Sequence, residues 1–136
     1  MKPSKIRCDV LVMGTGMAGM AAALFAAQKG LSTAHAGMTG AINFSSGLLD
    51  LLGVWPMGTQ TGIRKNPWEG IDALVQDMPR HPFARISKTE IRESIDAFTA
   101  FLEKNGLSYT GYPDRNALVI SPAGTVKPTF RVPLSM

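Results

Sequence analysis

The sequence predicts an α/β fold: two parallel strands joined by a helix, followed by a smaller α+β segment. Three observations lead to this prediction. A short apolar run ends in closely spaced glycines, and an alanine-rich stretch follows it directly. Two helix-start signals with apolar residues at helical spacing come after residue 65. Three β-like runs separated by proline and glycine turns complete the sequence, and the expected boundary separates residues 1–50 from 51–136.

The first part predicts a strand, a helix and a second strand. Residues 5–13 form a short run rich in valine and leucine, which we expect to be a strand buried on both faces. Residues 17–29 contain six alanines and favour a helix. Gly30 follows at the position where helices commonly end in a left-handed turn. Residues 31–36 can then form the second strand, which makes the unit a right-handed crossover with parallel strands.

The second part predicts two helices and then strands. Asn66 is expected to cap a helix that ends before Pro79. Ser87 and Glu90 form a capping box for a second helix, which reaches to about Asn105. Strand-like runs follow at residues 107–112, 117–122 and 125–132.

Composition and charge exclude several classes of protein. The 136 residues are room for one ordinary domain, and 45% hydrophobic residues are enough to form a core. The net charge is +4, but the basic residues are scattered, so we do not expect a nucleic-acid groove. The single cysteine, Cys8, excludes an internal disulfide and indicates a reducing compartment.

Two further kinds of site are not expected. Residues 8–27 are long and apolar enough for a membrane span, which needs about 20 residues. Asp9 and three glycines within six residues argue against a span and favour two buried elements with a turn between them. His35 and His81 are too few and too far apart to indicate a metal site.

The glycine turn carries the chemistry. Gly14-x-Gly16-x-x-Gly19 follows an expected strand and opens an expected helix, which is the context that a dinucleotide fingerprint requires. Gly14 permits the tight turn, Gly16 lets the backbone approach a pyrophosphate, and Gly19 lets the helix pack closely on the strand. The turn therefore predicts a Rossmann-like start that binds a dinucleotide or flavin nucleotide; the alternative is glycine used for packing alone. The expected cofactor-binding residues of the turn are Gly14, Thr15, Gly16, Met17, Ala18 and Gly19.

The second half of the fingerprint is missing. An acidic residue that binds ribose is expected about 20 residues after the glycines, at the end of the second strand. That stretch is Ala34-His35-Ala36-Gly37, which has no acid. His35 could hydrogen-bond a ribose, or it could be a packed or solvent-facing bystander. The adenosine end of a cofactor would then be held less firmly or be absent.

The residues resemble a known family. The opening VLVMGTGMAGMAAALFAAQKGL resembles the flavin-binding start of the family that contains fumarate reductase flavoprotein subunits and glycerol-3-phosphate dehydrogenases. Within that family, the segment Ile42–Leu52 is similar to the FSSGxLDLL signature of the B subunit of anaerobic glycerol-3-phosphate dehydrogenase. His81-Pro82-Phe83 and the segments at 121–125 and 127–129 are also similar to that subunit. The missing acid fits the narrower pattern of this subunit.

The resemblance implies a function. It implies a flavin-binding subunit, with FAD or FMN, of a cytoplasmic enzyme that oxidises sn-glycerol 3-phosphate to dihydroxyacetone phosphate. Electrons would pass through an iron–sulfur subunit to a quinone, and partner subunits, including a sister flavoprotein, would hold the enzyme at the inner face of the cell membrane. Ser45, Ser46 and Gly47 would lie near the flavin. Family members are longer, so the chain is expected to be an N-terminal portion, with an incomplete flavoprotein fold and no activity alone.

The catalytic residues stay open. His81 lies in a His-Pro turn, where a structural or exposed role is the more common one. Leu48, Leu49, Leu51 and Leu52 are expected to include core anchors, not a membrane contact. A nicotinamide-binding dehydrogenase domain and a structural subunit without cofactor are the alternative functions. The arginines that could meet a substrate phosphate are Arg64, Arg80, Arg85 and Arg131, and their spacing selects none of them.

Overall fold

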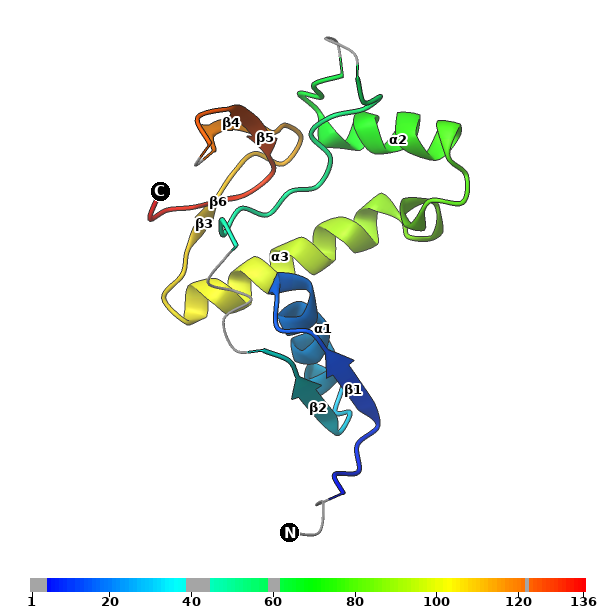
Figure 1. Cartoon of the computed structure of the whole chain (residues 1–136), viewed down its shortest axis with the longest axis vertical. Helices are drawn as coiled ribbons and strands as arrows, with labels where there is room; N and C mark the ends of the chain where they lie inside the picture. The colour runs from blue at the N-terminus through cyan, green and yellow to red at the C-terminus, as the bar shows by residue number, and fades with distance from the viewer. Residues whose placement is uncertain (1–4, 39–44, 59–61, 122) are drawn as a thin grey trace. The chain divides into compact units, whose positions relative to one another are not determined.

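The chain divides into two units, with the division after Ser46. The computed structural model describes residues 5–38, 45–58, 62–121 and 123–136 (Figure 1). The first unit is Met1–Ser46 and the second is Gly47–Met136. Every helix in the described part of the chain is too short or too polar to cross a membrane.

The first unit has the predicted α/β start. Strand β1 (Val10–Met13) is followed by helix α1 (Met17–Gln28) and strand β2 (Thr33–Ala36). The two strands pair in parallel, with Val10 opposite Thr33 and Met13 opposite Ala36. Both strands are shorter than predicted, because pairing begins only at residues 10 and 33. The Rossmann-like β-α-β arrangement predicted from the sequence is confirmed.

The prediction that the first strand is buried on both faces is wrong for this structure. Val10 and Val12 are half-buried, whereas Leu11 and Met13 leave 55% and 81% of their surface exposed. Successive residues of a strand point to opposite faces, and α1 covers one face of a sheet that has two strands. Within the described residues of this unit, no second layer covers the other face, so its apolar side chains remain in solvent.

The second unit begins its helices where the caps were predicted. Helix α2 (Pro67–Asp77) starts after Asn66, whose side chain accepts a hydrogen bond from the Trp68 amide at 3.0 Å. Helix α3 (Lys88–Lys104) starts with a complete capping box between Ser87 and Glu90. A short 3₁₀ helix, η2 (Pro82–Arg85), lies between them. Local side-chain chemistry therefore fixes both helix starts.

The strands of the second unit form two small antiparallel pairs. Strand β3 (Tyr109–Thr110) pairs with β6 (Val132–Pro133), and β4 (Ala117–Ile120) pairs with β5 (Val126–Thr129). The predicted strand 125–132 is thus split into β5 and β6. The reason is that the amides of Phe130 and Arg131 both donate to the Leu49 carbonyl, at 3.1 and 3.0 Å, and leave the β4 ladder.

The core of the second unit joins distant parts of the sequence. Trp68 and Ile71 from α2 pack with Phe130, which is 1% exposed. The rings of Trp68 and Phe130 meet edge to face, with centroids 5.5 Å apart. Leu51 and Leu52 are partly buried against this cluster. These contacts support the prediction that the leucine-rich segment includes core anchors.

Candidate nucleotide-binding site

The glycine turn is tied to both strands of the first unit. Gly14 directly follows β1, and its amide donates to the Ala36 carbonyl at 2.8 Å, at the end of β2. Its φ of +125° is a conformation that glycine adopts readily and other residues rarely do. The turn therefore needs glycine at this position for its backbone alone.

Gly19 lets α1 lie directly on the turn. A Cβ built at Gly19 would be 2.0 Å from the Gly14 oxygen, far inside contact distance. At Gly16 the same construction meets nothing within 4 Å. The two glycines thus differ: Gly19 faces inward, toward the turn, and Gly16 faces open space where a ligand could approach.

The start of α1 presents a row of amides that no described residue accepts from. The first helical backbone bond is that from Met20 to the Gly16 carbonyl, at 3.0 Å. Within the described residues, the amides from Thr15 to Gly19 donate to no acceptor, and the N-cap, Gly16, has no side chain to cap them. The first turn of α1 holds no acidic residue. Such a helix start attracts an anion through its N–H groups and its dipole.

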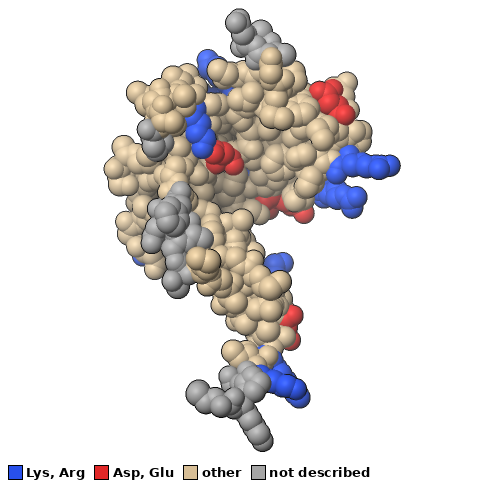
Figure 2. Space-filling model, in the orientation of Figure 1, with Lys and Arg blue, Asp and Glu red and all other residues tan. Residues whose placement is uncertain are grey.

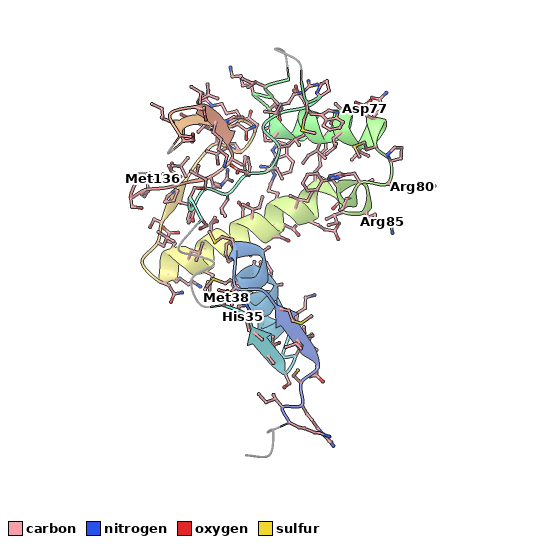
Figure 3. All side chains as sticks on the ribbon, in the orientation of Figure 1. His35, Met38, Asp77, Arg80, Arg85 and Met136 are labelled. Carbon is pink, nitrogen blue, oxygen red and sulfur yellow. The ribbon has the colours of Figure 1, made fainter. Side chains whose placement is uncertain are left out.

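Two residues beyond the fingerprint also shape the turn. His35 of β2, labelled in Figure 3, places its Nε2 atom 2.7 Å from the Gly14 oxygen. A Cβ at Gly37 would lie 2.8 Å from Thr15 Cγ2 and 3.1 Å from the Thr15 nitrogen. Thr15 itself donates its hydroxyl to the Met38 carbonyl. The sequence left His35 either as a ribose contact or as a packed or solvent-facing bystander. Its pairing opposite Val12, beside the glycine turn, is the signal that could have indicated this contact.

The second predicted part of the cofactor site, Ser45 to Gly47, lies at the boundary between the two units. Ser45 and Ser46 are exposed and belong to the first unit, and Gly47 begins the second. The Gly47 carbonyl accepts a hydrogen bond from the Tyr109 hydroxyl at 2.7 Å, and burial raises the pKa of that phenol. Residues 42–44 of the FSSG signature lie outside the described residues. A flavin contact by Ser45, Ser46 or Gly47 stays a prediction.

Two of the four candidate arginines have structural partners. Arg64 donates from Nε to the Trp55 carbonyl at 2.7 Å. Arg131 donates to the Tyr112 carbonyl at 2.8 Å and lies 3.4 Å from an Asp96 carboxylate oxygen. Arg80 and Arg85 are exposed, and Figure 3 shows both near α2 and η2, at the surface of the second unit.

His81 has a structural role in the second unit. Its Nδ1 atom accepts from the Phe83 amide at 3.2 Å, which caps η2. This contact agrees with the structural role expected for a turn histidine. A catalytic base is therefore not identified among the candidate residues.

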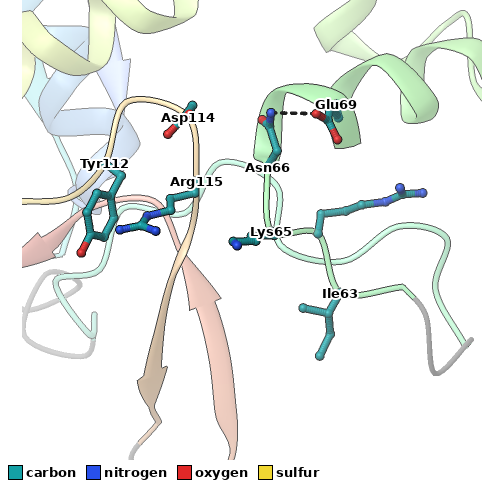
Figure 4. Close-up of a pocket in the computed structure, with 8 residues that line it drawn as sticks. Ile63, Lys65, Asn66, Glu69, Tyr112, Asp114 and Arg115 are labelled. Atoms are coloured by element: carbon teal, nitrogen blue, oxygen red, sulfur yellow. Dashed lines mark hydrogen bonds between the residues drawn. The ribbon is translucent and has the colours of Figure 1, made fainter.

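A polar cavity of about 530 Å³ lies in the second unit (Figure 4). Lys65 and Arg115 both line it, and Arg115 stacks on the Tyr112 ring with 3.5 Å between its Cζ and the centroid. Beside it, the buried Asn116 amide donates to the carbonyls of Leu52 and Arg64, each at 2.9 Å. Sequence reasoning missed this cavity because residues 65 and 115 are brought together only by tertiary folding.

Figure 2 shows the described Lys and Arg residues scattered among uncharged ones on the visible face. Between Val10 and Gln28 the sequence has no charged residue at all. Attraction of an anion to the glycine turn therefore rests on backbone dipoles and not on basic side chains.

A family model and similar known proteins both indicate the family to which the chain belongs. A family model described as an FAD binding domain matches residues 9–136. The chain is 33% identical over 128 residues to the B subunit of anaerobic glycerol-3-phosphate dehydrogenase from Yersinia pseudotuberculosis. It is 32% identical over 124 residues to the Aliivibrio fischeri protein of the same name. It is 36% identical over 132 residues to a Halobacterium salinarum protein described as a probable B subunit of the same enzyme.

These relatives are much longer than the chain. The matches cover 90%, 92% and 96% of this chain but only 27% to 29% of the relatives. No solved structure matches the chain. The relatives' names thus describe whole proteins of which this chain spans less than a third.

Proposed function

The chain belongs to the family of FAD-binding domains, and we propose that it forms the flavin-binding part of the B subunit of an anaerobic glycerol-3-phosphate dehydrogenase. FAD is the cofactor that the family model specifies. The family match gives no support to the alternative of a nicotinamide-binding dehydrogenase domain. The observation that carries the proposal is the row of amides at the start of α1, from Thr15 to Gly19, that have no acceptor in the described part of the chain.

The residues present fit the pyrophosphate of FAD. The amides from Thr15 to Gly19 supply donors without intramolecular acceptors among the described residues, and Gly16 leaves the approach to them open. The positive end of the α1 dipole adds an attraction for two phosphate charges. We therefore assign the pyrophosphate to the amides of Thr15, Gly16, Met17, Ala18 and Gly19, and we assign to Gly14 the part of the cofactor site that shapes the turn.

The substrate and partners follow from the same resemblance. In the proposed enzyme, sn-glycerol 3-phosphate would be oxidised to dihydroxyacetone phosphate, and bound FAD, held by the turn of residues 14–19, would supply the two-electron acceptor. An iron–sulfur subunit and a sister flavoprotein subunit would pass the electrons to a quinone and hold the complex at the inner face of the membrane. The contribution of this chain is to hold the cofactor in place by its pyrophosphate.

Cofactor binding is tested by titrating the ¹⁵N-labelled chain with a series of nucleotides and reading the amide resonances. We expect FAD and ADP to shift the amides from Thr15 to Gly19, because both carry a pyrophosphate. Riboflavin, which has no phosphate, is the matched control and should leave these amides unchanged. FMN, the alternative flavin cofactor, is titrated in the same way, and the flavin that shifts these amides at the lower concentration is the preferred cofactor. Millimolar FAD and ADP that leave this turn unchanged would refute the site and favour a structural subunit without cofactor.

The substrate and partners are tested on the complex isolated through a tag on this chain. We expect a co-purifying iron–sulfur protein and a flavin absorbance band near about 450 nm. Adding sn-glycerol 3-phosphate should bleach this band, whereas glycerol, which lacks the phosphate, should not. A flavin band that glycerol 3-phosphate leaves unchanged would support the proposed cofactor but contradict the proposed substrate.

A further inference from the structure

We propose that His35 is a positioning residue for the cofactor: it holds the Gly14 carbonyl inward and thereby turns the Thr15 amide outward, toward the pyrophosphate. The proposal rests on the proposed FAD binding and adds a residue that is not part of the glycine fingerprint. His35 comes from β2, and its contact spans 21 residues of sequence.

The contact defines which atom of the ring carries a proton. His35 Nε2 lies 2.7 Å from the Gly14 oxygen, and a carbonyl oxygen can only accept a hydrogen bond. Nε2 must therefore be the protonated nitrogen when the ring is neutral. The bond also persists in the cationic ring, because both nitrogens then carry protons.

The geometry of the peptide group transmits this contact to the binding side. The Gly14–Thr15 peptide is planar and trans, so its C=O and N–H point in opposite directions. Holding the carbonyl oxygen against His35 directs the Thr15 N–H away from it. Within the described residues that N–H has no acceptor. The missing side chain at Gly37, whose Cβ would lie 3.1 Å from the Thr15 nitrogen, leaves space beside it.

The turn needs such an anchor because glycine can adopt more than one backbone conformation. Gly14 has a φ of +125°, and without a partner its carbonyl could rotate toward the ligand. A carbonyl oxygen facing a phosphate would repel it, whereas an N–H attracts it. The 2.0 Å between the Gly14 oxygen and a Cβ at Gly19 shows how closely α1 approaches the inward carbonyl.

This role also explains what β2 contributes in place of the missing acid. Residues 34–37 supply no carboxylate for a ribose. Through His35, β2 acts on the cofactor indirectly, by fixing the turn that binds the pyrophosphate. Of the two roles left open for His35, the contact with the Gly14 carbonyl corresponds to a residue packed against the backbone.

Binding of ADP by the whole chain tests the proposal, with amide resonances as the readout. His35→Ala should weaken ADP binding about three- to tenfold, the value of one ordinary hydrogen bond. His35→Gln should restore binding to within about twofold, because its amide can donate to the same carbonyl. His81→Ala removes the other histidine, from the second unit, and should leave ADP binding unchanged.

A second readout needs no ligand. Long-range ¹H–¹⁵N spectra of the neutral ring should show the proton of His35 on Nε2. A proton on Nδ1 would overturn the proposal, as would a folded His35→Ala chain that binds ADP as tightly as the wild type. Should His35→Ala not fold, His35→Leu replaces it in the comparison with His35→Gln, and equal ADP binding by these two would overturn the proposal. A wild-type chain that does not bind ADP would refute the proposed function, and the role of His35 with it.

Discussion

Replacing Gly16 with valine should remove cofactor binding and leave the fold of the first unit intact. A Cβ at Gly16 meets nothing within 4 Å, so the branched side chain has room in the free protein. The backbone there has φ −77° and ψ 176°, an extended conformation that valine adopts readily. The same side chain would occupy the space in front of the free amides, where the pyrophosphate is expected.

Displacing the phosphates from two amides removes two charge-assisted hydrogen bonds, at about 1.5 kcal/mol each, or roughly a hundredfold in affinity. Folding stability should change by no more than about 1 kcal/mol, the usual range for an N-cap substitution. Gly19→Ala should behave in the opposite way. Its Cβ would lie 2.0 Å from the Gly14 oxygen, so the turn or α1 must shift at a cost of about 1–3 kcal/mol.

The assay combines an FAD titration with thermal unfolding, both followed by the amide resonances of α1. Gly16→Ala, with one added methyl group, is the graded control and should bind with intermediate affinity. We expect Gly16→Val to unfold like the wild type and Gly19→Ala to unfold at a lower temperature. Equal FAD affinity in Gly16→Val and the wild type would refute the assignment of the pyrophosphate to this turn.

The remaining predictions concern affinity, core and pH. The chain of residues 1–136 should bind FAD only weakly, because it holds the phosphate turn but spans less than a third of its relatives; sub-micromolar affinity by calorimetry would contradict this. Leu51→Ala and Leu52→Ala should each lower the free energy of unfolding by about 2 kcal/mol, and with it the melting temperature, because both side chains pack on the core. An unchanged melting temperature would indicate that the segment is an interface. Hydrogen bonds from Ser87 hold the pKa of Glu90 below 4.5. The stability from ionised Glu90 is therefore present above about pH 4.5 and lost as the pH falls through the lowered folded-state pKa. Ser87→Ala should raise the pKa of Glu90, as followed by the carboxyl ¹³C shift. An unchanged pKa would show that the hydrogen bonds from Ser87 are not what lowers it.

Local features of the fold could be predicted because their signals are short in sequence. Asn66 and Ser87 each bond to an amide two or three residues away, so their patterns can be recognised without knowledge of the fold. Gly14 and Gly19 likewise lie close together in the sequence, so their spacing can be recognised without knowledge of the fold. The family match confirms the α/β class and the FAD-binding family that these features and the resemblance indicated.

The features that could not be predicted depend on long-range contacts. The break between β5 and β6 occurs because Leu49 accepts two amides from a segment about 80 residues away. His35 contacts Gly14 only because β1 and β2 pair in this register. The exposed face of β1 reflects how many layers cover the sheet, which the apolar run itself does not encode.

The Leu49 carbonyl that accepts the Phe130 and Arg131 amides imposes an order on folding during synthesis. The contacts of the first unit, such as that of His35 with Gly14, span 21 residues and become available early. Leu49 receives its hydrogen bonds with Phe130 and Arg131 only when these residues have left the ribosome. Pulsed hydrogen exchange should therefore protect the amide of Val12 before that of Leu49, and protection in the reverse order would contradict this sequence of events. Until residues 129–131 emerge, the chain carries the apolar segment at 48–52 without its final cover, which leaves this segment open to aggregation or chaperone binding.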